Sequence, residues 1–367
     1  MKAYLLDAYG KGRGLRLADV SEPAIGPDDV LIEIHAAGVN LLDTKIRDGA
    51  FKPILPYKPP VILGHDVAGL VAGVGAHVTR FQIGDAVYAR PRDGRIGTFA
   101  EFIAVDQADV ARKPANLSMQ EAASIPLVGL TAWQVLVEQA KVAPGQKVLI
   151  HAGSGGVGTF AIQLARHLGA HVATTAGTAN LGLVRDLGAE IVVDYRKQDF
   201  SEELTGYDVV LNSLDARTLR KSLKVLKPGG ALVSISGPPD PAFASKQGLS
   251  WIFRQAIRVL SAGIRRKAKR QGVSYAFLFM HASGEQLAAI TALIESGAIR
   301  PVIDRVFPFD RLNEALAYAE AGRAKGKIVV SLISSNVAPS LVTSKRAGAP
   351  TATPKLRPAT LPSKVVR

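Results

Sequence analysis

Residues Lys147 to Gly158 read KVLIHAGSGGVG, an apolar run that leads directly into a glycine-rich turn. The stretch TFAIQLARHLGA that follows has apolar residues at helical spacing, which predicts a helix from Thr159 to Leu168, ended by Gly169. The turn has the spacing G-x-G-x-x-G, in which missing Cβ atoms let the backbone approach a phosphate. Because free N–H groups at a helix start attract anions, the pattern predicts dinucleotide binding by Gly153, Ser154, Gly155, Gly156, Val157 and Gly158. The simpler alternative is a tight strand-helix connection.

The next apolar run, HVATT (171–175), bears on which dinucleotide is bound. NAD enzymes usually carry an acidic residue at the end of this strand for the ribose 2′-hydroxyl, and here Thr175 stands instead. No carboxylate occurs between Gly158 and Arg185, so none repels a 2′-phosphate. Tyr195, with Arg196 beside it, follows the third strand and is predicted to approach that phosphate. We therefore favour NADPH, and the alternative is an enzyme that accepts NADH as well.

The composition is that of a globular chain without thiol chemistry. Its 367 residues are 47% hydrophobic, enough for two domains with cores of their own, and the absence of cysteine excludes disulfides and thiolate metal sites. The first ten residues, MKAYLLDAYG, predict a strand rather than a secretory leader. The longest mostly apolar stretch, 122–137, is interrupted by polar residues, proline and glycine, so no membrane span is indicated and we expect a cytoplasmic protein.

The net charge of +14 is concentrated in two segments. Residues 241–284 contain eight basic side chains and no acidic one, and residues 334–367 contain six basic side chains and no acidic one. These fourteen charges equal the whole excess, so the rest of the chain is balanced.

The order of patterns along the chain predicts an α/β protein of two domains. Residues 1–117 consist of short β-rich runs separated by turns, typical of a small barrel-like domain. A capping box at Ser118, S-M-Q-E, predicts a helix to about Ala140 with an irregularity at Pro126. From Lys147 strands and helices alternate, which indicates a doubly wound parallel sheet. After Pro301 the pattern becomes β-rich again and is expected to rejoin the first domain, while 334–367 is rich in Pro, Ala, Ser, Thr and Lys and is predicted to be disordered.

Several blocks together resemble the medium-chain dehydrogenase/reductase superfamily, within its zinc-independent quinone oxidoreductase and enone reductase branch. They are AAGVNLLDTKIRDG, LGHDVAGLVAGVG, GTFAEF, IPLVGLTAWQVL, HAGSGGVG and RAKGKIVVSL, and they span residues 1 to about 333. The resemblance implies a GroES-like catalytic domain (1–117 and 300–333), a Rossmann domain (118–299) with a basic insertion (241–280), a cleft between them, and a homodimer.

Zinc chemistry is the first expectation that the resemblance raises, because the superfamily's alcohol dehydrogenases hold zinc with thiolates and histidine. Here Asn40 stands where a ligand cysteine would be, and His65 is followed by Asp66. One His and one Asp without sulfur make a poor tetrahedral site, so no bound metal is expected. His65 is instead predicted to line the substrate pocket or to pack in the core.

Without a Lewis acid, hydride addition to an α,β-unsaturated ketone needs a hydrogen-bond donor for the enolate oxygen. Lys45, in N-L-L-D-T-K, aligns with the lysine of similar enone reductases, and we assign it this catalytic role; the alternative is a solvated surface lysine. Asn40 and Asp43 are expected to shape the same wall, although Asp43 is equally suited to cap a helix. The proton donor is not identified by the sequence.

Further cofactor contacts follow from the resemblance and from strand ends. Thr131 in the G-L-T-A block and Lys327 in RAKGKIVVSL are assigned to the cofactor, and Asn180 stands where many NADPH-using relatives have a basic residue. Ser213 and Ser236 follow the fourth and fifth strands, where ligands lie in open α/β sheets; the alternative is that they are ordinary polar strand ends.

These patterns predict hydride transfer from NADPH to an enone, alkenal or quinone. The alternatives are one-electron quinone reduction and a protein that uses the cofactor fold as a scaffold for association with RNA or membranes.

Residues 250–264 are predicted to form a basic amphipathic helix. Its apolar face holds Ile252, Phe253, Ala256, Ile257, Leu260 and Ile264. We favour packing of this face on the protein itself, as a lid or dimer contact, over binding to an anionic membrane. Because aromatic residues are sparse among the basic ones, binding to nucleic acid is disfavoured.

Overall fold

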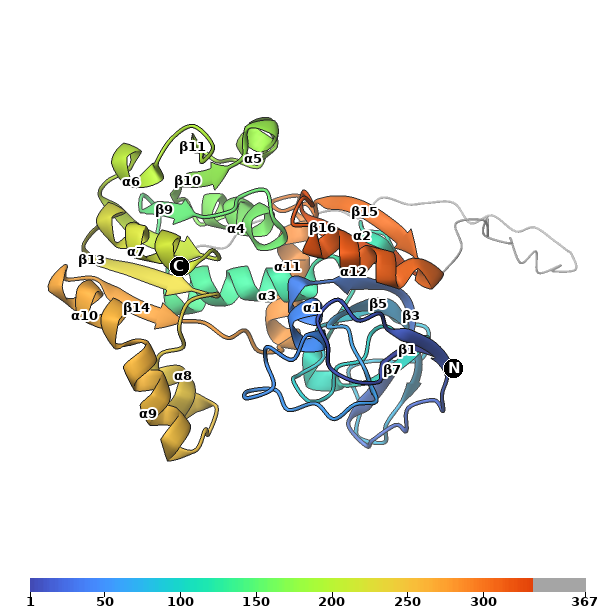
Figure 1. Cartoon of the computed structure of the whole chain (residues 1–367). Helices are drawn as coiled ribbons and strands as arrows, with labels where there is room; N and C mark the ends of the chain where they lie inside the picture. The colour runs from blue at the N-terminus through green and yellow to red at the C-terminus, as the bar shows by residue number, and fades with distance from the viewer. Residues whose placement is uncertain (333–367) are drawn as a thin grey trace, which may run out of the picture. The chain divides into compact units, whose positions relative to one another are not determined.

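The computed structural model describes residues 1–332, so the predicted disordered tail lies outside the described part of the chain (Figure 1). The described residues contain a three-stranded sheet, a seven-stranded sheet and a six-stranded parallel sheet. The prediction of an α/β protein with a β-rich part and a doubly wound parallel sheet is confirmed by this architecture.

The β-rich part is built from both ends of the described chain. One sheet has the order β2-β1-β4, and the larger sheet has the order β15-β16-β3-β5-β6-β8, with β7 paired to β3. Strand β16 runs antiparallel to β3, with Val329 opposite Gly38. The strands are β1 (Lys2–Leu6), β2 (Arg16–Asp19), β3 (Asp29–Val39), β4 (Val61–Ile62), β5 (Asp66–Val74), β6 (Ala86–Ala89), β7 (Phe102–Asp106), β8 (Val110–Arg112), β15 (Ile303–Pro308) and β16 (Lys327–Ser331). Two helices, α1 (Leu41–Arg47) and α12 (Leu312–Glu320), pack against each other beside this sheet.

The parallel sheet has the order β11-β10-β9-β12-β13-β14. Its order reverses between β10 and β12, on either side of β9, and this switch point is where open α/β sheets bind ligands. The strands are β9 (Lys147–Ile150), β10 (His171–Ala176), β11 (Ile191–Asp194), β12 (Tyr207–Asn212), β13 (Leu226–Ser234) and β14 (Ser274–Phe277).

Both faces of the parallel sheet are buried, which explains the nearly continuous apolar strands. Val148 and Ile150 belong to the core under α3 (Pro126–Trp133), α4 (Gly156–His167) and α5 (Leu181–Asp186). Leu149 belongs to the core under α6 (Phe200–Glu203), α7 (Ala216–Val225) and α10 (Ala262–Arg270). Two further helices, α2 (Met119–Ala123) and α11 (Gly284–Glu295), precede β9 and follow β14 in the chain. Side-chain alternation along each strand therefore supplies two separate cores.

Two helix predictions need correction. The predicted helix from Ser118 to Ala140 is divided into α2, α3 and a π-helical turn (Gln134–Gln139), and the first division is the irregularity predicted at Pro126. The division falls before Pro126, which has no N–H to donate and therefore begins a new helix. The helix after the glycine turn begins at Gly156, three residues before the predicted Thr159, because the glycines themselves adopt helical backbone angles.

Part of the basic segment 241–280, which was predicted to be an insertion, belongs to the parallel sheet. Its end forms β14, the sixth strand of the parallel sheet, which the sequence reading missed although SYAF is rich in β-favouring aromatic residues. The remainder forms α8 (Pro241–Lys246), α9 (Trp251–Leu260) and α10 (Ala262–Arg270). The single helix predicted for 250–264 is therefore broken at Ser261, and among its predicted apolar face only Ile257 and Ile264 are buried.

Within residues 1–332, no helix is both long and apolar enough to cross a lipid bilayer.

Candidate functional site

The glycine turn lies at the carboxyl end of β9 and leaves no room for side chains at two positions. A Cβ on Gly153 would lie 2.1 Å from Thr174 Oγ1, and one on Gly158 would lie 2.3 Å from the Ala152 carbonyl oxygen. Gly155 is the N-cap of α4 and has no side-chain capping bond. No side chain therefore covers the start of α4, an arrangement that fits a pyrophosphate.

Strand β10 holds the glycine turn in place through hydrogen bonds to Thr175. Ala152 has a φ of +53°, in the left-handed region that non-glycine residues rarely adopt, and its N–H donates to Thr175 Oγ1 over 3.2 Å. The Gly153 N–H donates to the Thr175 carbonyl over 3.0 Å. Thr175 is itself buried, so the structure shows it holding the turn in shape rather than presenting a hydroxyl to solvent.

His151 extends this support into the core. Its Nδ1 lies 3.2 Å from Thr175 Oγ1 and its Nε2 lies 2.9 Å from Ser222 Oγ. Burial lowers the pKa of His151 to about 3, so the ring stays neutral beneath the turn. The sequence reading did not assign His151, although it stands inside the glycine motif.

Polar groups gather past the end of β10, beside Gly177. The position of a Cβ on Gly177 is 3.1 Å from the Tyr195 hydroxyl and 3.5 Å from Arg196 Nε. Both side chains are exposed, and Arg196 forms no ion pair within the described residues. An aromatic hydroxyl and a guanidinium thus lie together beside Gly177, and their contact with a 2′-phosphate stays a prediction.

A carboxylate that the sequence reading missed lies at the same edge. Asp194 ends β11, and its Oδ2 accepts a 2.6 Å hydrogen bond from Thr178 Oγ1. That hydrogen bond lowers the pKa of Asp194, and the N–H of Arg196 contributes by donating to Oδ1. The signal that could have found Asp194 is its place at the end of the strand adjacent to β10.

Asn180 and the two serines lie at the same edge of the sheet. Asn180 Nδ2 donates to Ser154 Oγ over 3.1 Å, while its Oδ1 is buried without a partner among the described residues. Ser213 Oγ donates to the His151 carbonyl over 3.4 Å, and Ser236 Oγ donates to the Leu214 carbonyl over 2.6 Å. Buried Asn212, which the sequence reading did not assign, donates to Ser234 Oγ between them over 3.1 Å.

A second polar cluster belongs to the β-rich part and begins at α1. Asn40 is the N-cap of α1, and its N–H donates to Asp43 Oδ2 over 2.8 Å, so the predicted capping role of Asp43 is present. The other oxygen of Asp43 accepts a 2.6 Å hydrogen bond from His65 Nδ1. Asp43 and His65 are fully buried, and His65 Nε2 has no partner in the described chain.

Lys327 and Asp66 join this cluster to the glycine turn. Lys327 Nζ donates to Asp66 Oδ2 over 2.9 Å and also contacts Asn40 Oδ1. The other Asp66 oxygen accepts the N–H of Leu127, in the first turn of α3, over 2.7 Å. Beside Lys327, the Gly326 N–H donates to the Ser154 carbonyl over 2.8 Å. The polar cluster and the phosphate cradle are therefore adjacent, and Asp66, which the sequence reading assigned to no pocket, lies at its centre.

Two assigned residues stand apart from the cluster. Thr131 lies on α3, where its hydroxyl donates to the Leu127 carbonyl over 2.6 Å. Lys45 is on the exposed face of α1 with Leu41, one turn earlier, and its ammonium makes no hydrogen bond or ion pair among the described residues. Its catalytic role stays a prediction.

Comparisons with known proteins agree with this arrangement. Residues 26–115 match the family model for the alcohol dehydrogenase GroES-like domain, and residues 187–330 match a model described as zinc-binding dehydrogenase. The chain is 35% identical over 355 residues to the mitochondrial NAD(P)H oxidoreductase RTN4IP1 of Danio rerio, covering 91% of this chain and 92% of that one. It is 36% identical to the 2-methylene-furan-3-one reductase of Solanum lycopersicum, over 90% of this chain and 79% of that one. Among solved structures, the quinone oxidoreductase of Coxiella burnetii superposes with a TM-score of 0.79 at 30% identity, covering 91% of this chain and 99% of that one.

The residues present do not fit the zinc that one of these family descriptions implies. Zinc sites use three or four thiolate, imidazole or carboxylate ligands, and the chain contains no cysteine. Lys327 already neutralises Asp66, and Asp43 engages the His65 ring. Within residues 1–332 no three His, Cys, Asp or Glu side chains converge so as to hold a metal ion.

Proposed function

The chain belongs to the medium-chain dehydrogenase/reductase superfamily, and on this premise we propose that it is a zinc-independent, NADPH-dependent oxidoreductase that transfers hydride to an enone, an alkenal or a quinone. The observation that carries the proposal is the adjacency of the phosphate cradle and the buried polar cluster through Gly326 and Lys327. Relatives named for enone and quinone reduction support the substrate class.

The bound nicotinamide cofactor supplies the hydride. The first turn of α4 would hold its pyrophosphate, with Tyr195 and Arg196 at the 2′-phosphate. The short link from Ser154 through Gly326 to Lys327 and Asn40 would align the nicotinamide end with the buried polar cluster. Preference for NADPH over NADH rests on the Arg196 guanidinium, which forms no ion pair within residues 1–332, although the Asp194 carboxylate lies close enough to feel its charge.

Hydride addition at the β-carbon of an enone leaves negative charge on the carbonyl oxygen, which needs a hydrogen-bond donor. In the proposal Lys45 supplies that donor. Its ammonium is exposed and has no other partner among residues 1–332, so it is free to meet a substrate oxygen. Removing one such donor from an active site typically lowers kcat by about a hundredfold to a thousandfold.

The test follows NADPH absorbance with a panel of enones and quinones in wild type, Lys45→Ala and the control Lys58→Ala, which removes another exposed lysine. We expect Lys45→Ala to lose enone turnover while its NADPH dissociation constant is unchanged. Unchanged turnover removes Lys45 from the mechanism. If no enone or quinone is turned over by wild type, the proposed function itself is wrong.

One-electron reduction of quinones is the rival within the enzyme class. It would make the semiquinone radical the first product, detectable by electron paramagnetic resonance before quinol accumulates, whereas hydride transfer forms the two-electron-reduced quinol directly. We also propose a homodimer in the cytoplasm. Light scattering measures the oligomeric state. Cell fractionation measures the localisation, and recovery of the protein in mitochondria, where the name of the Danio rerio relative places that protein, would contradict a cytoplasmic one.

A further inference from the structure

Helix α9 exposes most of its apolar residues. Trp251, Ile252, Val259 and Leu260 are 71%, 64%, 75% and 66% exposed. Ile257 is the one buried residue of the helix, and it packs with Phe243 and Ala244 of α8. Figure 1 shows α8 and α9 standing off the parallel sheet, to which α10 connects them. Exposed apolar residues gathered on one helix usually mark a binding surface.

The exposed residues are ordered around the helix. At about 100° per residue, Ile252, Ala256, Val259 and Leu260 fall in one continuous arc. Phe253 and Ile257 follow on one side of this arc, with Ile257 towards the protein, and Arg254 and Arg258 lie on the face opposite the arc. The helix therefore presents an apolar strip to its surroundings and carries its own two cations on the opposite face, as an amphipathic helix does.

Helix α10 adds positive charge next to this strip. It carries Arg265, Arg266, Lys267, Lys269 and Arg270 within nine residues, and the segment 241–284 contains no acidic residue. None of the basic side chains of α9 and α10 forms an ion pair within the described part of the chain. The Arg265 guanidinium is held only by Ser261 Oγ, at 3.2 Å, and the Arg258 carbonyl, at 3.3 Å.

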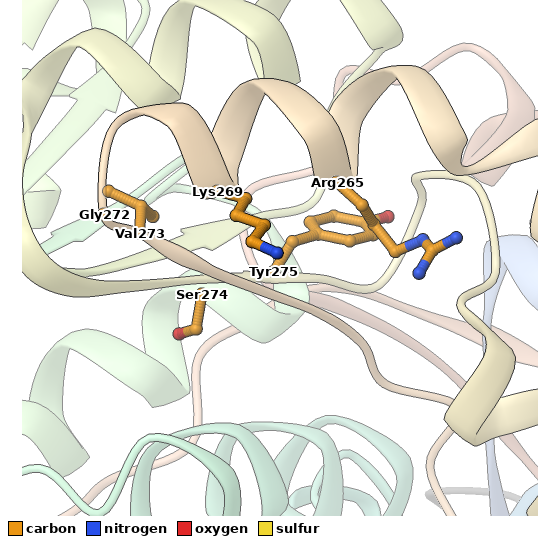
Figure 2. Close-up of a pocket in the computed structure, with 6 residues that line it drawn as sticks. All are labelled: Arg265, Lys269, Gly272, Val273, Ser274 and Tyr275. Carbon is orange, nitrogen blue, oxygen red and sulfur yellow. The ribbon is translucent and has the colours of Figure 1, made fainter.

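An open hollow lies between α10 and β14 on the same segment. Its volume is about 460 Å³, and its lining is Arg265, Lys269, Gly272, Val273, Ser274 and Tyr275. Figure 2 shows Arg265 and Lys269 extending from the same helix, with the Tyr275 ring between them. Two cations beside an open hollow suit a phosphate group, whereas the Ser274 hydroxyl already donates to the Gly230 carbonyl.

We propose that α9 and α10 form a docking surface for an anionic phospholipid bilayer, with the apolar strip of α9 at the boundary between headgroups and acyl chains. The α10 cations and the hollow would then contact lipid phosphates. An anionic surface matches the charge of this segment, and the bilayer boundary matches the exposed apolar strip. A second copy seated on the same face would bring two unpaired cationic helices together, and single-stranded nucleic acid would leave Ile252, Val259 and Leu260 uncovered. The proposal does not rest on the enzymatic function.

The direct test is sedimentation of the full chain with vesicles of phosphatidylcholine containing about 30% phosphatidylglycerol, against vesicles of phosphatidylcholine alone. We expect binding to the anionic vesicles only. The variant Val259→Ser with Leu260→Ser removes apolar contact, and Arg266→Glu with Lys267→Glu reverses charge; each is expected to weaken binding at least tenfold. Because these side chains are exposed, the fold should be kept, and an unchanged melting temperature checks this. The matched control is Lys11→Glu with Arg13→Glu, an exposed cationic pair elsewhere, which should leave binding unchanged.

Fluorescence gives a second readout at the helix itself. The chain has two tryptophans, so Trp133→Phe leaves Trp251 as the sole reporter. A blue shift of its emission with anionic vesicles, absent with neutral ones, would place α9 in the bilayer boundary.

Three outcomes would overturn the proposal. The first is unchanged vesicle binding in the α9 and α10 variants together with its loss on replacing Lys345, Arg346, Lys355 and Arg357 by Gln, which would assign binding to residues 334–367. The second is conversion of a dimer to a monomer by the α9 variant without any effect on vesicles. The third is salt-sensitive binding to RNA without a Trp251 shift on vesicles.

Discussion

The Lys327 ammonium lies 2.9 Å from Asp66 Oδ2, and the two side chains are 6% and 0% exposed. Asp66 ends the G-H-D block and begins β5, and Lys327 begins β16, so this ion pair ties β5 to β16 and, through the Leu127 N–H, to α3. Because water is excluded from both groups, removing one leaves the other charge buried and unpaired.

We therefore expect Lys327→Met to lower the free energy of unfolding by about 3 kcal/mol, the usual cost of an unpaired buried charge. Asp66→Asn should have a cost of similar size. The double variant should lose less than the sum of the single variants, by about 1 kcal/mol or more, since it leaves no lone charge. Urea unfolding of the four proteins measures this cycle, and additive losses would show that the two groups act independently.

The glycine turn predicts a steric effect. Gly153→Ala places a Cβ 2.1 Å from Thr174 Oγ1, so we expect a loss of about 1–3 kcal/mol in unfolding free energy and weaker NADPH binding. Gly182→Ala is the matched control. Nothing lies within 4 Å of its Cβ position, and alanine favours a helix, so that variant should be slightly stabilised. Combining Gly153→Ala with Thr174→Ala should recover part of the lost unfolding free energy. If it does not, the contact with Thr174 is not the cause of the loss.

His151 predicts a pH effect on stability. Its pKa is about 3 in the folded protein, against 6.5 in an unfolded chain, so below pH 6.5 the unfolded state binds the additional proton. The unfolding free energy should therefore fall as the pH decreases, by about 2 kcal/mol between pH 7.5 and pH 5 from this residue alone. Chemical unfolding at the two pH values should show a smaller fall in His151→Gln than in wild type. His167→Gln, which removes an exposed histidine that forms no ion pair within residues 1–332, is the control and should behave like wild type.

Arg196 is expected to determine the preference for NADPH over NADH. Arg196→Ala removes the unpaired guanidinium beside Gly177, and we expect about a tenfold weaker affinity for NADPH with little change for NADH. Calorimetric titration with both cofactors measures the ratio. Lys224→Ala, another exposed cation in the same sheet domain, is the control. An equal loss of affinity for both cofactors would show that Arg196 does not contact the 2′-phosphate.

Local sequence determined the elements that depend on local chemistry. The apolar run before Gly153 and the periodicity after it predicted a strand, a turn and a helix, and the S-M-Q-E box at Ser118 is present as a capping box. Alternation of strands and helices was enough to predict a parallel doubly wound sheet, since such chains have few other ways to bury two apolar faces. Strand β14 was missed because four residues inside a basic segment carry too weak a pattern.

The partners of buried charges were decided only by tertiary structure. Nothing in the sequence around Asp66 indicates Lys327, which is 261 residues away, or the Leu127 N–H, and these contacts exist because β16 returns to pair with β3. The amphipathic pattern of 250–264 was readable from sequence, but whether its apolar face is covered depends on where the neighbouring elements fold. Sequence periodicity records which side chains share a face, whereas burial of that face is a property of the packed whole.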